Sequence, residues 1–590
     1  SNSAFGSEAL DDCTTGSNNT GIGVNALQKN TTASNNTAVG KDALLANTTG
    51  ANLVGVGVDA LTTNTTGNSS VAVGLEALKL NTTGSNNVGI GQEALQKNTT
   101  ASNNTGVGHN ALKDNTTGAN NTALGSNALG ANTTAQYNTA LGKSSLQANT
   151  TGASNTGCGT QTLEVNTTGA QNTAVGYAAL SANTTADMNT AVGYFALQAN
   201  TTGAENTSVG TSALDSNTTG SNNTAVGRLA LQTNSTASDN TAVGYNSLGA
   251  NTTGTRNVAV GANALDGNTT ANDNVAVGYE CLSGSAQSGT DNVAIGNFTM
   301  DANTSGSDNT AVGKSALGAN TTGSNNTGLG REALLLNTTA NNNTGVGYQA
   351  LRANTTATEN TAVGSLALQV CTTGGQNTAV GSQALQTCST AQNNAAFGRE
   401  TLHDLTTGSQ NTGCGRSAGE QITTGNNNVC IGFNSGRAAS PGGAITTGSN
   451  RVVLGNDDTT DLFCADTSIS ASDLRDKTDI ADFKIGLDWI NALRPVTYVW
   501  DKRTWYGTEE EPYGTPDGSK KKSKINIGLL AQEVLAVEKA NGYGDNSDNM
   551  LVCNLTDDEM RYGVKYERLV PILVNAIKEL SAKVTALEAG

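Results

Sequence analysis

Residues 172–188 read NTAVGYAALSANTTADM, and this unit decides the fold because close copies of it fill most of the chain. Its glycine, Gly176, belongs to a series that runs from Gly6 to Gly278 at intervals of 17 residues. One additional residue then enters, after which the same interval resumes and continues to Gly432. A fixed period predicts a repeat architecture, in which each unit buries its apolar face on its neighbours.

The composition excludes one wide globular core. Aromatic residues make up 4% of the 590 residues and charged residues 13%, whereas there are 71 glycines. Large apolar side chains are too few to fill such a core, so order has to come from repetition. The formal net charge of −17 argues against nucleic acid or an anionic lipid surface as a general partner. No apolar stretch is long enough for membrane insertion.

Each unit of 17 residues is expected to form one coil of a β-solenoid. Short apolar pairs separated by Gly, Asn and Thr fit two short strands joined by turns, because Gly and Asn tolerate the positive φ of tight corners. The Val before the glycine and the Leu four residues after it are expected to fill the narrow interior. Frequent Gly, Asn and Thr, without a continuous apolar stripe, argue against helix.

Two columns of asparagine follow from the period, and both are predicted to hydrogen-bond along the stack. One column includes Asn172, four residues before the glycine, and the other includes Asn183, seven residues after a glycine. The second column begins an Asn-Thr-Thr sequence that is also a glycosylation motif. Cys13, Cys371 and Cys388 replace this Asn. Because cysteine favours burial, we interpret the column as a stacked, inward-facing corner rather than a row of glycans.

The cysteines and histidines do not indicate a metal or cofactor site. The nine cysteines are scattered without a C-x-x-C pair, and the two histidines are His109 and His403. We therefore expect no metal and no cofactor. Residues 415–419 read GRSAG and fit the nucleophile motif of hydrolases. Gly415 is the repeat glycine, however, and no histidine follows it, so we interpret this match as incidental.

The composition changes after about Gly455, where the period ends and Trp, Tyr, Lys, Asp and Glu become frequent. All three tryptophans of the chain lie beyond this point. Such a change indicates a globular domain with its own core. We divide the chain into a repeat stalk at residues 1–436, a transition segment at 437–471 and a C-terminal domain at 472–590.

The C-terminal domain begins with a recognisable pattern. Residues 472–477 read SDLRDK, and three segments follow in order: GLDWINALRPVTY at 486–498, IGLLAQEV at 527–534 and YERLVP at 566–571. Together they resemble the intramolecular chaperone domain of phage tail spikes and tail fibres, peptidase family S74. The sequence departs from the pattern at Asp476, where many relatives carry an apolar residue.

The resemblance implies a domain that assists fibre assembly and then releases itself by a single cut. The cut would fall between Ala471 and Ser472, with Ser472 as the nucleophile and Lys477 as the base. Asp473 and Arg475 would orient this pair. A partly desolvated lysine can activate a serine hydroxyl, so a Ser-Lys endopeptidase needs no histidine. The alternative, from spacing alone, is that Ser472 and Asp473 cap a turn or a helix.

The last helix is predicted to carry a coiled-coil seam. Its apolar residues are spaced four, three, four and three apart, as in two heptads. They are Leu573, Ile577, Leu580, Val584 and Leu587. A free helix of this length is marginal in water, so packing against other copies of the chain is expected. The alternative is a seam that packs against its own domain.

The N-T-A-V-G segments are also similar to the head repeats of trimeric autotransporter adhesins, which form β-rolls. The predicted fold is therefore an all-β repetitive stalk of solenoid or β-roll coils, assembled as a homotrimer, followed by a small α+β chaperone domain that ends in a coiled-coil helix. A trimer would also bury a further face of so thin a core.

The predicted function is a structural, phage-like fibre for host attachment. The expected partners are two further copies of the chain, other virion tail proteins and a host-cell surface receptor, with a glycan as one candidate. The fibre would be made in the host cytoplasm and would act in the virion tail. A cellular surface adhesin or filament and an ice-binding solenoid are the alternatives. A depolymerase is disfavoured because the acidic residues of the repeats form no clustered pair.

Overall fold

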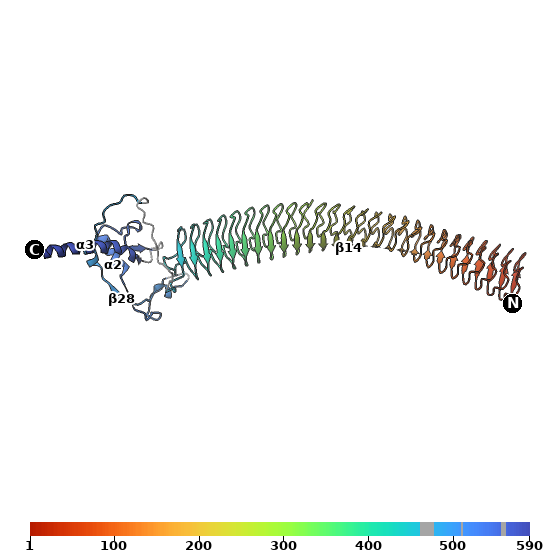
Figure 1. The fold of residues 1–590 in the computed structure, drawn as a ribbon, viewed down its shortest axis with the longest axis horizontal. Coiled ribbons are helices and arrows are strands. Elements are labelled where there is room, and N and C mark those ends of the chain that lie inside the picture. The colour runs from red at the N-terminus through yellow and green to blue at the C-terminus, as the bar shows by residue number, and fades with distance from the viewer. Residues whose placement is uncertain (461–476, 509–510, 512, 556–561) are drawn as a thin grey trace. The chain divides into compact units, whose positions relative to one another are not determined.

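The computed structural model describes residues 1–460, 477–508, 511, 513–555 and 562–590. The chain forms two compact units, Ser1–Ala340 and Asn341–Gly590. Both units contain β-solenoid coils, and the second also contains the helices of the C-terminal domain (Figure 1). Within the described residues, no helix combines the length and the hydropathy needed to cross a bilayer.

The first unit contains one three-residue strand per coil. The strands are β1 (Ser3–Phe5), β2 (Thr20–Ile22), β3 (Thr37–Val39), β4 (Val54–Val56), β5 (Val71–Val73), β6 (Val88–Ile90), β7 (Thr105–Val107), β8 (Thr122–Leu124), β9 (Thr139–Leu141), β10 (Thr156–Cys158), β11 (Thr173–Val175), β12 (Thr190–Val192), β13 (Thr207–Val209), β14 (Thr224–Val226), β15 (Thr241–Val243), β16 (Val258–Val260), β17 (Val275–Val277), β18 (Val293–Ile295), β19 (Thr310–Val312) and β20 (Thr327–Leu329).

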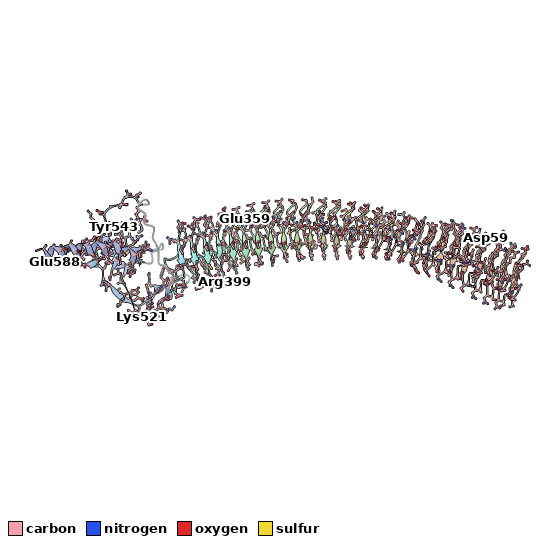
Figure 2. The ribbon with its side chains drawn as sticks, viewed as in Figure 1. Asp59, Glu359, Arg399, Lys521, Tyr543 and Glu588 are labelled. Atoms are coloured by element: carbon pink, nitrogen blue, oxygen red, sulfur yellow. The ribbon has the colours of Figure 1, made fainter. Side chains whose placement is uncertain are left out.

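The coils of the second unit follow the same plan. Their strands are β21 (Thr344–Val346), β22 (Thr361–Val363), β23 (Thr378–Val380), β24 (Ala395–Phe397), β25 (Thr412–Cys414), β26 (Val429–Ile431) and β27 (Val452–Leu454). Charged side chains such as those of Glu359 and Arg399 are exposed on the outside of these coils (Figure 2).

Within each unit, successive strands pair in parallel and in register, so that equivalent residues lie beside one another. Ala174 of β11, for example, lies opposite Ala191 of β12. The expectation of two strands per coil was wrong, because the remainder of each coil consists of turns. These turns still pair along the stack: the Leu180 amide donates to the Ala196 carbonyl at 3.1 Å. The repeat period therefore predicted the length of each coil, but it did not predict how many residues of the coil are in strands.

The interior is filled by Leu and Ala, whereas the Val before the glycine faces outward. Leu180 and Ala174 are fully buried, but Thr173 and Val175 on either side of Ala174 are only half-buried. Neighbouring residues of a strand point to opposite faces. Asn172 is buried, so the alternation turns Ala174 inward and Val175 outward. The expectation that Val fills the interior was therefore wrong.

Tight backbone geometry makes the repeat glycine indispensable. Gly176 has a φ of +130°, and a Cβ atom there would lie 2.3 Å from the carbonyl oxygen of Gly193 in the next coil. The buried asparagines are not the residues with positive φ. Exposed asparagines such as Asn222 do adopt it, at 59°, as predicted for the corners, and so do Ala178 and Leu180, at φ of 53° and 52°. Left-handed geometry is costly for such residues, and burial of the Leu180 side chain offsets this cost.

The two asparagine columns form the predicted hydrogen-bonded ladders. The side-chain amide of Asn183 donates to Asn166 Oδ1 in the preceding coil at 2.8 Å and to the Ala186 carbonyl at 3.0 Å. Asn172 Nδ2 donates to the same Ala186 carbonyl at 2.8 Å, so the two columns share an acceptor. Both asparagines are fully buried. This burial supports the stacked-corner interpretation of the Asn-Thr-Thr sequence over a row of glycans.

Among its described residues, the C-terminal domain contains helices of 6 to 20 residues, 3₁₀ turns and two antiparallel strand pairs, β28 with β29 and β30 with β31. In chain order the elements are α1 (Leu487–Ala492), β28 (Val496–Tyr498), a 3₁₀ turn (Arg503–Tyr506), β29 (Asn526–Gly528), α2 (Ala531–Ala540), a 3₁₀ turn (Ser547–Asn549), β30 (Cys553–Leu555), β31 (Tyr562–Val564), a 3₁₀ turn (Tyr566–Arg568) and α3 (Leu569–Glu588).

The ladder gives a direct prediction for Asn183→Ala. The change removes both bonds that Asn183 donates and the acceptor that Asn200 uses at 3.0 Å. Leaving buried polar groups unsatisfied costs about 1–3 kcal/mol, so local opening of the adjacent coils should become easier by that amount. Hydrogen exchange of their backbone amides measures this. Thr185→Ala, at an exposed residue of the same corner, is the control; equal protection in the two variants would contradict a structural role for the ladder.

Candidate functional site in the C-terminal domain

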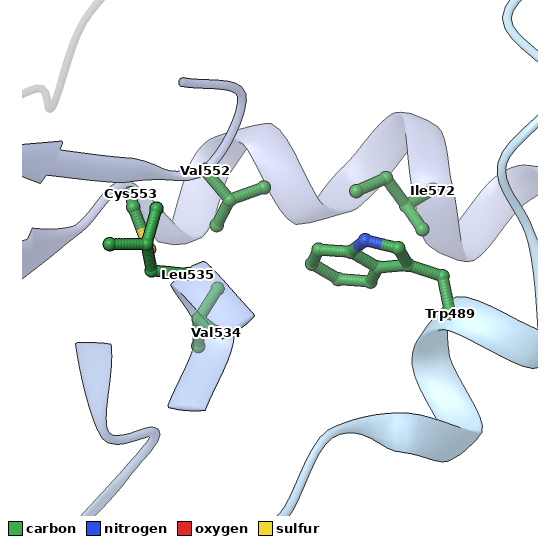
Figure 3. Close-up of a cluster of buried hydrophobic side chains, with 6 residues drawn as sticks. All are labelled: Trp489, Val534, Leu535, Val552, Cys553 and Ile572. Carbon is green, nitrogen blue, oxygen red and sulfur yellow. The ribbon is translucent and has the colours of Figure 1, made fainter. Parts of the chain in front are cut away.

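The C-terminal domain has a small apolar core that joins its helices. Figure 3 shows the cluster, which draws on α1, α2, α3 and the start of β30. Its buried members are Trp489, Val534, Leu535, Val552, Cys553 and Ile572. Burial raises the pKa of the Cys553 thiol to about 12, so this cysteine acts as an apolar core residue rather than a nucleophile.

A buried carboxylate fixes the loop beside this core. Glu538, on α2, is fully buried. Its Oε1 accepts hydrogen bonds from the Val552 and Cys553 amides, and its Oε2 accepts one from Leu551 at 3.2 Å. Three backbone donors thus replace the water that the carboxylate loses on burial. Sequence reasoning missed this residue, although its position in the chain could have revealed it.

The missed signal is the spacing on α2. The buried residues of this helix are Ala531, Val534, Leu535 and Glu538. They follow the three-and-four spacing of one helix face. An acidic residue on the apolar face of an amphipathic helix indicates a buried carboxylate with dedicated donors, because an unpaired buried charge is too costly.

Polar contacts tie the start of the domain to α3. Asn575 Nδ2 on α3 donates to the carbonyl of Phe483 at 2.6 Å. Glu579 Oε2, one turn further along, accepts from the amide of Leu487 at 2.9 Å. The segment that leads into α1 is therefore held by the side of α3 that faces its own domain.

The predicted coiled-coil seam lies on a different side of α3. Ile572 and Ala576 are buried against the domain. Within the single chain, the seam residues are exposed by 41 to 82%: Leu573, Ile577, Leu580, Val584 and Leu587. The helix thus has one face for its own domain and a second, apolar face that the domain leaves open to solvent.

The predicted catalytic residues can be placed only in part. Ala471, Ser472, Asp473 and Arg475 lie outside the described residues. Lys477 is described, and it lies exposed on the chain ahead of α1. The pairing of Ser472 with Lys477 and the cut at Ala471 therefore stay predictions.

The fold defines the class of the chain as a repetitive β-solenoid that continues into a small α+β domain. Residues 472–543 match the family model of peptidase S74, described as the chaperone of endosialidase. The matched stretch begins at Ser472 and includes α1, β28, β29 and α2. Comparisons with curated proteins and with solved structures gave no match. The match is limited to this stretch. It suggests a phage-like fibre with an intramolecular chaperone, and the matched family implies self-cleaving peptidase activity in general.

Glu538→Gln tests the buried carboxylate. The amide keeps one acceptor oxygen and turns an NH₂ group toward backbone donors, so the free energy of unfolding of this domain should fall by about 2–3 kcal/mol. Tryptophan fluorescence during denaturant unfolding measures it, because all three tryptophans belong to this domain. Glu533→Gln, on the exposed side of α2 beside Arg494, should change stability little. Similar losses in both variants would show that burial of Glu538 is unimportant.

Proposed function

We propose that the chain is a structural fibre protein whose C-terminal domain promotes assembly of a homotrimer and then cleaves itself off between Ala471 and Ser472. The observation that carries this proposal is the family match that begins at Ser472, directly after the repetitive stalk and the transition segment. A chaperone in this position fits a stalk whose many similar coils have to be brought into one register.

The chemistry of the cut follows from the position of the serine. Ser472 comes directly after the scissile bond, so its Oγ can attack the carbonyl carbon of Ala471 and displace its own amine, giving an ester. Neutral Lys477 would accept the hydroxyl proton and return a proton to the amine. Water then hydrolyses the ester, which leaves a carboxylate on Ala471 and restores the serine. Each copy of the domain would react once.

The homotrimer is supported by two unpartnered apolar surfaces. The seam of α3 leaves Ile577 and Leu587 exposed by 65 and 82%, and such a heptad pattern is stable in water only against other helices. In the coils, the valines that precede the repeat glycines form an outward-facing row. Two of them, Val209 and Val243, are each 36% exposed. Packing copies of the chain together would cover both surfaces.

We further propose that the fibre acts in the virion tail, after synthesis in the host cytoplasm, and contacts other tail proteins and a host-cell surface receptor. A glycan is the favoured receptor class. Exposed tyrosines directly after the repeat glycine, at Tyr177, Tyr194 and Tyr245, supply amphipathic ring surface of the kind that is enriched at binding surfaces.

Self-cleavage is tested by the denatured mass of the purified protein. The parent chain should yield fragments 1–471 and 472–590, whereas Ser472→Ala and Lys477→Ala should stay whole because they lack the nucleophile and the base. Lys484→Ala, at an exposed lysine of the same segment, should still be cut. A parent chain that stays whole would reduce the domain to an uncleaved assembly module and would contradict the peptidase proposal.

Trimerisation through α3 is tested by light scattering in the Ser472→Ala background, where the domain stays attached. Ile577→Asp places a charge on the seam and should shift the mass from three chains toward one, since burying an unpaired carboxylate is strongly unfavourable. Ala582→Asp adds the same charge at an exposed residue off the seam and should leave the mass at three chains. A monomeric parent, or a trimer in both variants, would contradict the role of the seam.

A further inference from the structure

The column of buried asparagines changes its chemistry near its C-terminal end. In the second unit the column holds Asn354, and the same position in the next four coils is then occupied by Cys371, Cys388, Leu405 and Ile422. All five side chains are fully buried. The two cysteines therefore lie where a ladder of amides gives way to an apolar column.

The two thiols make the contacts that amides make elsewhere in the column. Cys388 Sγ donates to Cys371 Sγ at 3.7 Å and contacts the Ala391 carbonyl at 3.8 Å. In the same way, Asn183 donates to Asn166 in the preceding coil and to the carbonyl three residues ahead. In-register stacking thus brings Cys388 Sγ into contact with Cys371 Sγ, and both residues are free thiols.

The backbone spacing between these coils suits a covalent link. The preceding strands β22 and β23 pair in parallel, and the Thr372 amide donates to the Ser389 carbonyl at 3.0 Å. Paired strands lie about 4.8 Å apart, and Cα atoms joined by a disulfide lie about 4.4–6.8 Å apart. The Cα spacing is therefore compatible with a disulfide, and the two sulfurs, which lie 3.7 Å apart as thiols, have to approach further for the bond to form. Among the nine cysteines of the sequence, this pair alone is separated by one repeat period of 17 residues.

We propose that Cys371 and Cys388 form an intrachain disulfide that staples two successive coils of the solenoid at the end of its asparagine ladder. The oxidant is a small-molecule disulfide such as oxidised glutathione. One thiolate attacks a sulfur of the oxidant and releases a thiolate, giving a mixed disulfide. The second cysteine thiolate attacks the protein sulfur of this mixed disulfide and releases the second small thiolate, so that two cysteine protons are lost and one oxidant is reduced to two thiols.

The environment of the pair determines when the bond can close. The hydrogen bond from Cys388 lowers the pKa of the Cys371 thiol, whereas that same bond and burial raise the pKa of Cys388. In the finished stack the Cys388 thiol is therefore held in its protonated form, which is unreactive because the thiolate is the nucleophile. A mixed disulfide with glutathione does not fit a fully buried site. The bond therefore closes while the coils are still stacking, and the finished stack shields it from reductants.

Refolding of the full chain in a mixture of reduced and oxidised glutathione tests the proposal. After denaturing alkylation, trypsin releases residues 353–399 as one peptide, which contains both cysteines and no internal Lys or Arg. We expect this peptide to carry no alkyl group before reduction and two after it. Cys281, which is also buried but has no cysteine one repeat away, should be alkylated with or without reduction. Two alkyl groups without reduction, or a glutathione adduct on either cysteine, would overturn the proposal.

A matched variant tests the stapling effect. Cys371→Asn with Cys388→Asn restores the amides that the repeat uses elsewhere. Amides of the coils around β22 and β23 should exchange several-fold more slowly in the oxidised parent than in the reduced parent, because a cross-link restrains the opened state. The variant should show no dependence on redox conditions. Equal exchange in the oxidised and reduced parent would overturn the staple.

Discussion

In-register stacking of one coil on the next is the constraint on which the whole stalk depends. Each coil contributes a strand of only three residues, so its backbone groups and its buried asparagines find their partners almost entirely in neighbouring coils. A single coil could satisfy neither. Glycine is needed where the backbones of successive coils approach most closely, as at Gly176, and residues without a branch at Cβ, such as Ala174 and Leu180, fill the space that remains.

The sequence predicted the features that period alone controls. The coil length and the two asparagine ladders followed from recurrence at one interval, and the inward corner at Asn183 followed from the cysteines that replace this asparagine in other coils. The number of strands and the direction of the valine did not, because they depend on how far the strand alternation extends before the glycine turns the chain. The left-handed backbone conformation of Leu180 could not be predicted from the sequence, because it is costly for leucine. In the C-terminal domain, the family resemblance located the chaperone segment, but the buried Glu538 required knowledge of which face of α2 is covered.

The same regularity creates a problem of register that the proposed chaperone would solve. Because the coils are nearly identical, a chain shifted by one whole repeat against its neighbours loses few contacts, and stacking can begin anywhere along the chain. In the proposed trimer, a folded domain with its core around Trp489 and an exposed helical seam would give the copies one favoured alignment. Joining three such domains first would fix the register of the stalks attached to them.

Refolding of the stalk with and without residues 472–590 tests this account most directly. The full chain carrying Ser472→Ala and a chain ending at Ala471 would be diluted from denaturant in parallel, and protection of the stalk amides from hydrogen exchange would be followed together with mass by light scattering. The account predicts that the full chain regains a protected stalk in particles of three chains, whereas the shortened chain yields unprotected or irregularly associated material. Equal recovery of protected trimers by both chains would contradict it.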